Sequence, residues 1–422
     1  MKFPSESKRR VLKIASDSIW SIAGLVLMNV VAQFVIYPIW NRQLGNESYG
    51  HILYLISAMN ILAISMGISC NYARMRSSAD GETYNRNYNR ILSVTSLISV
   101  PFMLIANAFS GATDSSVLET VLMILLTIAT MWRFYADVEY RLSLNYKGYF
   151  VYYLVISCGY GIGVGLFLLT NLWPLALLPG EIAGLLLVYW KGSIFQKDPD
   201  GEISENTKTV LKIVLTLFST SLISNLVSNG DRFLLNFIQS GTAVTIYYQA
   251  SLLGKTMTLV TTPLNSVIIG YLARTDQKLD KRMMNILTLS SMGATVLVTV
   301  ACTVASHIVI HLLYPQNYDL VKGYFLIANL GQVAGFVSSI VTTFLLRYCK
   351  VQYQLYVNIV YIILFAAICF PGAMLWGMEG FCIAATAVHF LRLCYSLFLG
   401  YWSLRRKEGG QNETAGSAGS AV

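Results

Sequence analysis

Residues 211–238 read LKIVLTLFSTSLISNLVSNGDRFLLNFI, an apolar run that holds an Asp and an Arg side by side. A helix needs about 20 predominantly apolar residues to span the hydrocarbon core of a bilayer, and this run is long enough. Asp231 and Arg232 cannot pair face to face, because neighbouring helix residues point about 100° apart. Each charge costs about 2.5–3.5 kcal/mol near the centre of a span, so the pair calls for a functional explanation.

The whole chain is as apolar in composition as this stretch suggests. Of the 422 residues, 55% are hydrophobic and only 12% are charged. Soluble domains carry about 25% charged residues. Apolar runs of spanning length recur from residue 16 to residue 402 and do not alternate at every second position, which disfavours a transmembrane β-barrel. The sequence therefore predicts an all-α polytopic membrane protein.

Twelve transmembrane helices are predicted. They cover residues 16–40, 49–71, 91–110, 118–139, 149–170, 173–190, 210–237, 245–272, 286–310, 320–346, 351–374 and 378–402. With these spans, 24 of the 30 Lys and Arg residues fall in the N-terminus, the even-numbered loops, the tail and, for Lys212, the start of the helix that follows the sixth loop. Since basic residues mark cytoplasmic loops, both termini are predicted to be cytoplasmic. The net charge of +9 is thus a topology signal, and nucleic-acid binding is not expected.

The two halves of the chain resemble each other. NVVAQFVIYPIWNRQLGNESYG begins at Asn29 and NLVSNGDRFLLNFIQSGTAVTIYY begins at Asn225, with Gly45 and Gly241 at the same offset. A parallel repeat of six spans is a transporter signature, with substrate bound between the halves. The predicted organisation is a basic cytoplasmic N-terminus (1–15), an N-terminal six-helix lobe (16–190), a cytoplasmic linker (191–209), a C-terminal six-helix lobe (210–404) and a disordered cytoplasmic tail (405–422).

Three stretches resemble the Wzx-type polysaccharide flippases. They are LGNESYG (44–50), NGDRFLL (229–235) with the following IYYQASLL, and LLYPQNYDLVKGYFLIANL (312–330). These flippases belong to the superfamily that also contains the MATE drug exporters. The resemblance covers about residues 16 to 400 and implies a MATE-like fold, with two lobes around a central cavity.

The same resemblance implies a function. The cargo would be an oligosaccharide repeat unit on undecaprenyl diphosphate, flipped from the inner to the outer leaflet of a bacterial inner membrane by alternating access. Such proteins serve O-antigen (lipopolysaccharide) or capsule assembly. The implied partners are membrane lipid and the polysaccharide polymerase and chain-length machinery. We expect no cofactor and no metal, and a proton or sodium gradient as the energy source.

Basic residues at membrane depth are the candidate substrate contacts. A diphosphate is anionic, and its oxygens suit the fork of an Arg side chain. We expect a ladder of positive charge that the diphosphate follows across the membrane. Its candidate members are Arg232, Lys255, Arg392 and Arg133 within helices, and Arg42 at the outer surface. The alternative is that these residues form ion pairs between helices, and for Arg133 the acid one turn away is Asp137.

Two acids are candidate ion-coupling residues, Asp231 and Glu181. Glu181 follows Pro179 and Gly180, and a proline frees a backbone carbonyl, so a local break in the helix is expected. An acid at such a break can take up a proton or a sodium ion. The alternative is that Glu181 pairs with a basic residue of the same lobe, such as Arg133.

Two other functions stay open at this point. An ion-coupled multidrug or cation antiporter on the same scaffold needs an acidic cavity, whereas four basic residues against two central acids favour an anion. A membrane-bound glycosyltransferase or polymerase usually has a large loop with clustered acids or His, and no such cluster of catalytic residues is present. GYGIGVG (159–165) has no preceding strand and no Walker Lys, so its GxxxG spacing predicts close helix packing.

Overall fold

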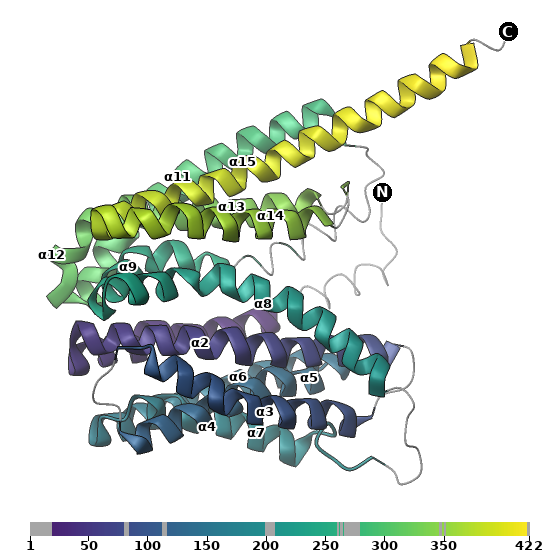
Figure 1. Cartoon of the computed structure of the whole chain (residues 1–422). Coiled ribbons are helices and arrows are strands. Elements are labelled where there is room, and N and C mark those ends of the chain that lie inside the picture. The colour runs from purple at the N-terminus through teal and green to yellow at the C-terminus, as the bar shows by residue number, and fades with distance from the viewer. Residues whose placement is uncertain are drawn as a thin grey trace, which may run out of the picture. The chain divides into compact units, whose positions relative to one another are not determined.

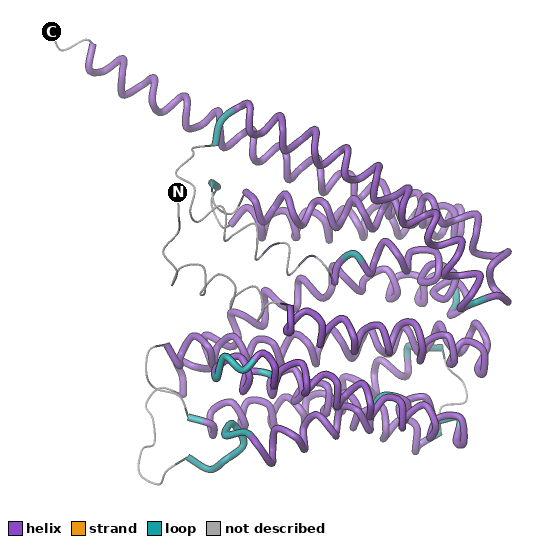
Figure 2. Tube along the Cα trace, turned by 180° about the vertical axis from the view of Figure 1, so that it is seen from behind, coloured by secondary structure: helices purple, strands orange, loops and turns teal. Residues whose placement is uncertain are grey.

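The computed structural model describes residues 19–79, 84–111, 116–198, 207–259, 261, 265, 279–345, 348–349 and 352–419. The predicted N-terminal segment 1–15 and the end of the predicted helix 245–272 lie outside these residues. Every regular element within them is a helix, and Figure 2 shows no strand in the described part of the chain. The all-α prediction is confirmed.

The chain forms two compact units, Met1–Thr245 and Ile246–Val422 (Figure 1). Unit 1 holds a helix from Ile19, then η1 (Val31–Ile36), α2 (Tyr37–Ala79), α3 (Asn85–Ala108), α4 (Val117–Ala136), α5 (Val138–Leu142), α6 (Tyr146–Thr170), η2 (Trp173–Ala176), α7 (Leu178–Lys191), α8 (Thr207–Ile238) and the start of α9 (Gly241–Thr256). Unit 2 holds the rest of α9, α11 (Lys281–Leu313), η3 (Pro315–Asn317), α12 (Tyr318–Val321), η4 (Lys322–Tyr324), α13 (Phe325–Leu345), α14 (Gln352–Leu364), η5 (Phe365–Cys369) and α15 (Phe370–Gly419).

The boundary between the units differs from the predicted linker. It falls after α8 because α8 packs along α2 and therefore groups with unit 1, whereas the sequence places its residues in the second lobe. The lobe boundaries stay predictions. At the other end of the chain, α15 continues to Gly419, so the segment predicted as a disordered tail is helical up to that residue.

Two of the long helices are hairpins. The chain reverses at Gly45, where φ is +79°, and the rings of Tyr37 and Tyr49 lie 6.3 Å apart. Twelve residues of straight helix would separate them by about 18 Å. α15 breaks at Trp376 and Gly377, and a Cβ on Gly380 would lie 2.2 Å from the carbonyl oxygen of Gly372. The continuous helical stretches that contain these reversals, Ile19–Ser78 and Tyr353–Arg405, therefore each cover two predicted spans.

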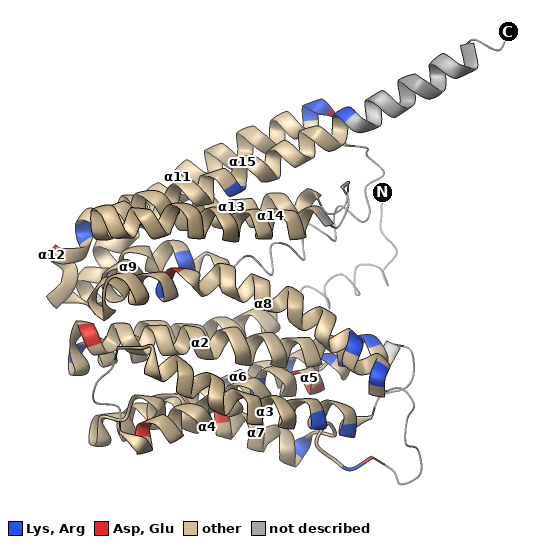
Figure 3. Cartoon of the chain, viewed as in Figure 1, with Lys and Arg blue, Asp and Glu red and all other residues tan. Residues whose placement is uncertain are grey.

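Among the described residues, eight helices are long and apolar enough to cross a membrane. α7 has 14 residues and α9 has 16, so both are shorter than a full span. The twelve-helix count and the cytoplasmic termini stay predictions. Figure 3 agrees with the charge pattern within unit 1, where Lys and Arg gather at the end of the bundle at which α2 ends and α8 begins.

The packing of α11 shows which solvent surrounds the helices. Its buried face carries small and hydroxylated residues, namely Ser291, Thr295, Thr299, Cys302 and Ser306. Its outer face is apolar, and Leu289 and Leu297 are 75% and 72% exposed. Small residues permit close helix approach in lipid, where an apolar outer surface is stable. The prediction of a multi-pass membrane protein is confirmed by this inverted pattern.

Glycines bring the helices of unit 1 close together. A Cβ on Gly159 of α6 would lie 2.5 Å from the Cα of Gly180 in α7, and one on Gly163 would lie 2.4 Å from the carbonyl oxygen of Ala176. The first predicted GxxxG pair therefore packs closely. Gly161 and Gly165, the second pair, face open space. This approach places α7, and with it Glu181, against α4.

Candidate substrate-binding site

Arg133 and Glu181 form a buried ion pair inside unit 1. Both side chains are 3% exposed, and Nε of Arg133 contacts Oε2 of Glu181. Oε1 of Glu181 accepts a hydrogen bond of 2.6 Å from the hydroxyl of Tyr160, and the hydroxyl of Tyr152 donates to the carbonyl oxygen of Arg133 at 3.1 Å. Arg133, a candidate substrate contact, is thus paired with Glu181, a candidate coupling acid. This is the ion-pair alternative that the sequence leaves open for each of them.

Asp137 is not the partner of Arg133. Its Oδ1 lies 3.1 Å from Nε of Arg141, and the hydroxyls of Tyr149 and Tyr153 donate to its Oδ2 at 3.1 and 3.0 Å. Asn71 donates to it as well. Arg133 and Arg141 both stand one turn from Asp137, so the spacing fits either of them. The position of Glu181 on α7 decides the pairing, and that position cannot be seen from α4 alone.

Asp231 and Arg232 are buried on α8, each 7% exposed. Nη1 of Arg232 donates to Oγ of Ser57 on α2 at 3.0 Å, and its backbone N–H donates to Oδ1 of Asp231 at 3.0 Å. Arg232 therefore reaches across to α2, while the neighbouring carboxylate accepts from the α8 backbone. The two adjacent charges have different surroundings, as their 100° separation requires.

A line of polar contacts continues along α2 and α8, and we call it the α2–α8 seam. It consists of the pairs Ser57–Arg232, Ser65–Asn225 at 3.0 Å and Ser69–Ser221 at 3.4 Å. As the residue number rises on α2 it falls on α8, so the two helices run antiparallel. Small polar residues thus recur along the contact, in keeping with helix association in lipid.

At the predicted outer end of the seam, the LGNESYG motif contacts the start of α9. The carboxylate of Glu47 accepts hydrogen bonds from the backbone N–H groups of Gly241 and Thr242 at 3.0 and 2.8 Å, so it caps the start of α9. A Cβ on Gly50 would lie 1.7 Å from the carbonyl oxygen of Gly241. The motif therefore needs a glycine at 50 for close approach and an acid at 47 for capping. Arg42 is exposed on the same hairpin.

Arg392 on α15 has neutral partners. Its Nη2 donates to Oδ1 of Asn358 on α14 at 3.2 Å, and its Cζ lies 5.2 Å from the ring centroid of Tyr361. Its buried Nε has no hydrogen-bond partner. Within the described part of unit 2, no carboxylate forms an ion pair with this guanidinium. We call such a residue an open arginine, in contrast to the closed pair of Arg133 and Glu181.

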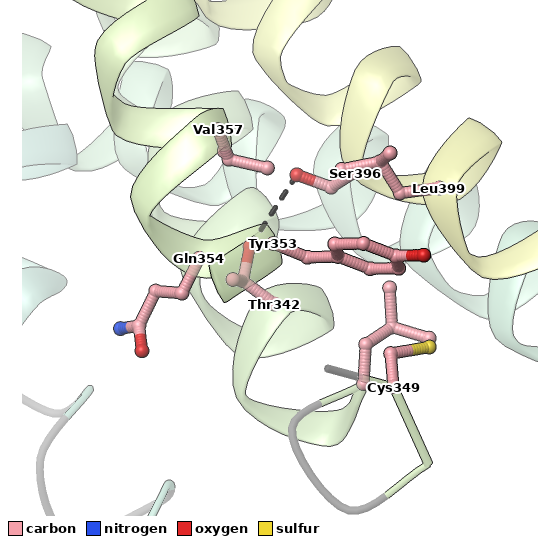
Figure 4. A pocket seen from close by; sticks show the side chains of 8 residues that line it. Thr342, Cys349, Tyr353, Gln354, Val357, Ser396 and Leu399 are labelled. Atoms are coloured by element: carbon pink, nitrogen blue, oxygen red, sulfur yellow. Dashed lines mark hydrogen bonds between the residues drawn. The ribbon is translucent and has the colours of Figure 1, made fainter. Parts of the chain in front are cut away.

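A narrow cavity lies one helical turn from Arg392 (Figure 4). It measures about 10 Å³, which is room for one water molecule. Ser396, four residues after Arg392, faces Thr342 in Figure 4, with their hydroxyls 3.3 Å apart. Gln354, four residues before Asn358, lines the same cavity. The cavity thus combines polar side chains with apolar ones such as Leu345, Val357 and Leu399, and none of the described residues that line it is charged.

Lys255 lies half-buried in the last turn of α9 in unit 2. The backbone N–H of the preceding Gly254 donates to Oδ1 of Asn329 at 2.7 Å, which ties this turn to α13. The predicted ladder of positive charge is thus divided between the units. Arg133, Arg232 and Arg42 belong to unit 1, and Lys255 and Arg392 belong to unit 2.

Arg74 is a buried residue that the sequence does not single out. It counts there as a cytoplasmic surface charge, yet it is only 6% exposed. Its Nη1 and Nη2 donate to the hydroxyl of Tyr135 and to Oδ1 of Asn85, both at 2.6 Å. Its Nε has no hydrogen-bond partner, and the guanidinium of Arg74 lies over the ring of Tyr88. Arg74 is therefore a second open arginine, and charge counting cannot distinguish it from an exposed one.

Comparisons with known proteins agree with this architecture. A family profile described as "Polysaccharide biosynthesis protein" matches residues 39–323. The comparison with curated proteins returned no match. The Vibrio cholerae MATE transporter VcmN in its bent form is similar, with a TM-score of 0.60, 14% identity, and coverage of 96% of this chain and 99% of that chain.

Two further solved structures share the fold. An inward-facing multidrug resistance MATE family transporter of the MOP superfamily aligns with a TM-score of 0.63 and 14% identity, over 92% of this chain and 99% of that chain. A MOP superfamily transporter from Pyrococcus furiosus aligns with a TM-score of 0.61 and 15% identity, over 93% and 95%. That protein is described as having a binding pocket of reverse polarity, which suggests a different function for it.

These findings confirm the resemblance to Wzx-type flippases. The solved structures share the fold at low identity, and the family profile covers more than half of the chain. The chain belongs to the polysaccharide biosynthesis protein family and is a multi-pass membrane protein with the MATE fold.

Proposed function

We propose that the chain is a flippase for lipid-linked sugars. It moves an oligosaccharide repeat unit on a polyprenyl diphosphate, such as undecaprenyl diphosphate, from the inner to the outer leaflet of a bacterial inner membrane by alternating access. The family supports a role in polysaccharide biosynthesis, and the fold supports transport rather than catalysis. O-antigen and capsule assembly both need such a step, followed by a polymerase and chain-length machinery.

Arg392 carries this proposal. A buried guanidinium without a carboxylate is costly, and an anionic cargo offsets that cost while it is bound. Its neutral partners Asn358 and Tyr361 leave the positive charge intact. A phosphate oxygen suits this group, because charge-assisted hydrogen bonds from Arg are strong and directional. Arg232, Lys255 and Arg42 are further proposed contacts along the route of the diphosphate.

Two acids of unit 1, Glu181 and Asp137, argue against a drug antiporter. A cation exporter needs a carboxylate that its cargo can reach, and Glu181 and Asp137 are both occupied by arginines. We assign the Arg133–Glu181 pair to holding α4 against α7. Asp231 remains the proposed coupling residue, for a proton or a sodium ion. The MOP superfamily transporter with the reversed pocket supports the view that this fold accommodates cavities of either polarity.

Deletion of the gene tests the proposed function. We expect lipid-linked repeat units to accumulate in the inner leaflet, and the wild-type chain to restore their outer exposure. Leaflet position is read with a membrane-impermeant sugar-oxidising reagent in intact spheroplasts. Unchanged sugars together with altered resistance to cationic dyes would reject the flippase and support the antiporter. Unchanged sugars and unchanged dye resistance would reject both.

A further inference from the structure

Two residues of α14 hold the guanidinium of Arg392. Asn358 accepts a hydrogen bond from Nη2 at 3.2 Å, and the ring of Tyr361 lies 5.2 Å from Cζ. Residues three apart lie on the same face of a helix, so α14 presents an amide oxygen and an aromatic face together. Tyr361 in turn packs against His389 of α15, with ring centroids 5.2 Å apart. The guanidinium is therefore fixed in position from the side of α14.

Both supports are neutral, and this sets Arg392 apart from Arg133 and Arg141. Those two arginines contact carboxylates, which cancel their charge. An amide oxygen and an aromatic ring orient a guanidinium without cancelling its charge. Nε of Arg392 is also buried without a hydrogen-bond partner, a property it shares with Nη1 of Arg133, so the neutral supports are what distinguish Arg392. A buried donor of this kind is costly until it finds an acceptor.

The polar groups next to Arg392 do not use that donor. Oγ of Ser396 donates to the carbonyl oxygen of Arg392 at 2.9 Å and lies 3.2 Å from Oγ of Ser338. These hydroxyls satisfy one another and the backbone of α15. They leave the Nε edge of the guanidinium as the group to which an incoming oxyanion can bind.

We infer that Asn358 and Tyr361 are positioning residues for an oxyanion site at Arg392, and that Asn358 makes the site selective for anions. The ligand class is the phosphate of a lipid phosphate or diphosphate, so the inference rests on the proposed function. A neutral amide at position 358 keeps the arginine open. A carboxylate at the same position, with nearly the same shape, would form an ion pair and close it, as Glu181 closes Arg133.

The test compares Asn358→Asp with Arg392→Ala in the full-length protein in nanodiscs. The probes are undecaprenyl phosphate, which is anionic, and undecaprenol, which is neutral. We expect both variants to bind undecaprenyl phosphate about tenfold more weakly than wild type or worse, because Arg392→Ala removes a charge-assisted hydrogen bond to the phosphate and Asn358→Asp gives the guanidinium a competing carboxylate. Binding of undecaprenol should not change in either variant. Inorganic pyrophosphate, tested as a competitor, shows whether a free phosphate is enough to occupy the site.

Two controls accompany these variants. Asn285→Asp makes the same change on α11, at an exposed residue that accepts from Tyr401, and should leave both probes unaffected. Tyr361→Phe keeps the ring and should bind as wild type, whereas Tyr361→Leu should lose affinity for the phosphate probe alone.

The outcomes separate the inference from the proposed function. If Arg392→Ala loses the phosphate probe and Asn358→Asp keeps it, the positioning role is overturned and the proposed function stands. If Asn358→Asp loses both probes equally, the residue acts through general structure and the inference is overturned. If Arg392→Ala binds the phosphate probe as wild type does, the site and the observation behind the proposed function both fail.

Discussion

Arg133 in unit 1 and Arg392 in unit 2 are arginines at membrane depth with opposite surroundings. Arg133 is closed by Glu181 and enclosed by tyrosines, whereas Arg392 is held by an amide and an aromatic ring. A closed pair is internally neutral and needs no further partner. An open arginine keeps its charge for a ligand. The difference teaches that function follows from the partner of a buried charge, and not from its presence in an apolar span.

Opening the closed pair should have the largest effect. Glu181→Gln leaves Arg133 buried without a counter-charge, and removal of one partner of a buried pair costs about 3–5 kcal/mol. We expect a large fall in the unfolding temperature of the detergent-solubilised protein. The double variant Arg133→Met, Glu181→Leu replaces the pair with apolar residues and should regain most of that loss. Wild-type stability in Glu181→Gln would show that the pair does not hold unit 1 together.

Removal of the open arginine should affect transport and spare stability. Arg392→Ala takes away one charge-assisted contact to the cargo, worth about 1.5–3 kcal/mol, or roughly 10- to 100-fold in cargo affinity. Outer-leaflet exposure of lipid-linked sugar should fall, while the unfolding temperature should not. Arg282→Ala, an exposed residue at the start of α11, is the matched control. If Arg392→Ala lowered the unfolding temperature but left transport normal, Arg392 would be a structural residue and not a contact to the cargo.

Substitution of Arg232 or Lys255 should reduce transport less than substitution of Arg392. Arg232 already donates to Ser57 on α2, so its contribution to cargo binding is shared with the seam. We expect Arg232→Ala and Lys255→Ala each to reduce surface polysaccharide by about tenfold while the protein stays in the membrane. Surface polysaccharide is measured against the amount of membrane-bound protein. Normal polysaccharide in both variants would reject the ladder of positive charge.

A pair of glycine variants on α6 tests how the closed pair of Arg133 and Glu181 is assembled. Gly159→Ala places a Cβ 2.5 Å from Cα of Gly180, so α6 and α7 must move apart, at about 1–3 kcal/mol. Gly161→Ala, two residues further on the open face of α6, should stay within about 0.5 kcal/mol of wild type. Both are measured by thermal unfolding. Equal stability of the two variants would mean that close approach of α6 and α7 is not needed.

The sequence predicts the fold well because lipid imposes one dominant rule. An apolar run of sufficient length must form a helix in a membrane, so composition alone indicates the spans. The reversal at Gly45 follows a motif that the sequence displays, and Gly159 packs as its GxxxG spacing predicts. Gly161 does not, because spacing does not reveal which face of α6 meets α7.

The partners of buried charges are less predictable. Glu181 lies 48 residues from Arg133, so the sequence offers their pairing only as one alternative, and the folded arrangement of α4 and α7 shows that they meet. Asp137 is the wrong partner for Arg133 because a one-turn spacing fits two arginines equally well. Arg74 is overlooked because basic residues near the predicted cytoplasmic ends are expected for topology alone. Glu47 stands in a motif that identifies a family without revealing that it caps α9.

The α2–α8 seam has a consequence for how easily these helices part. Three of its polar groups also bond within their own helix: Ser57 donates to the carbonyl oxygen of Leu53 at 2.8 Å, Ser69 to that of Ser65 at 2.5 Å, and Asn225 to that of Ser221 at 3.0 Å. When α2 and α8 separate, these groups therefore keep an acceptor, and the cost of stranding polar atoms in lipid largely disappears. At these three positions α2 and α8 can therefore part without leaving a buried donor unpaired.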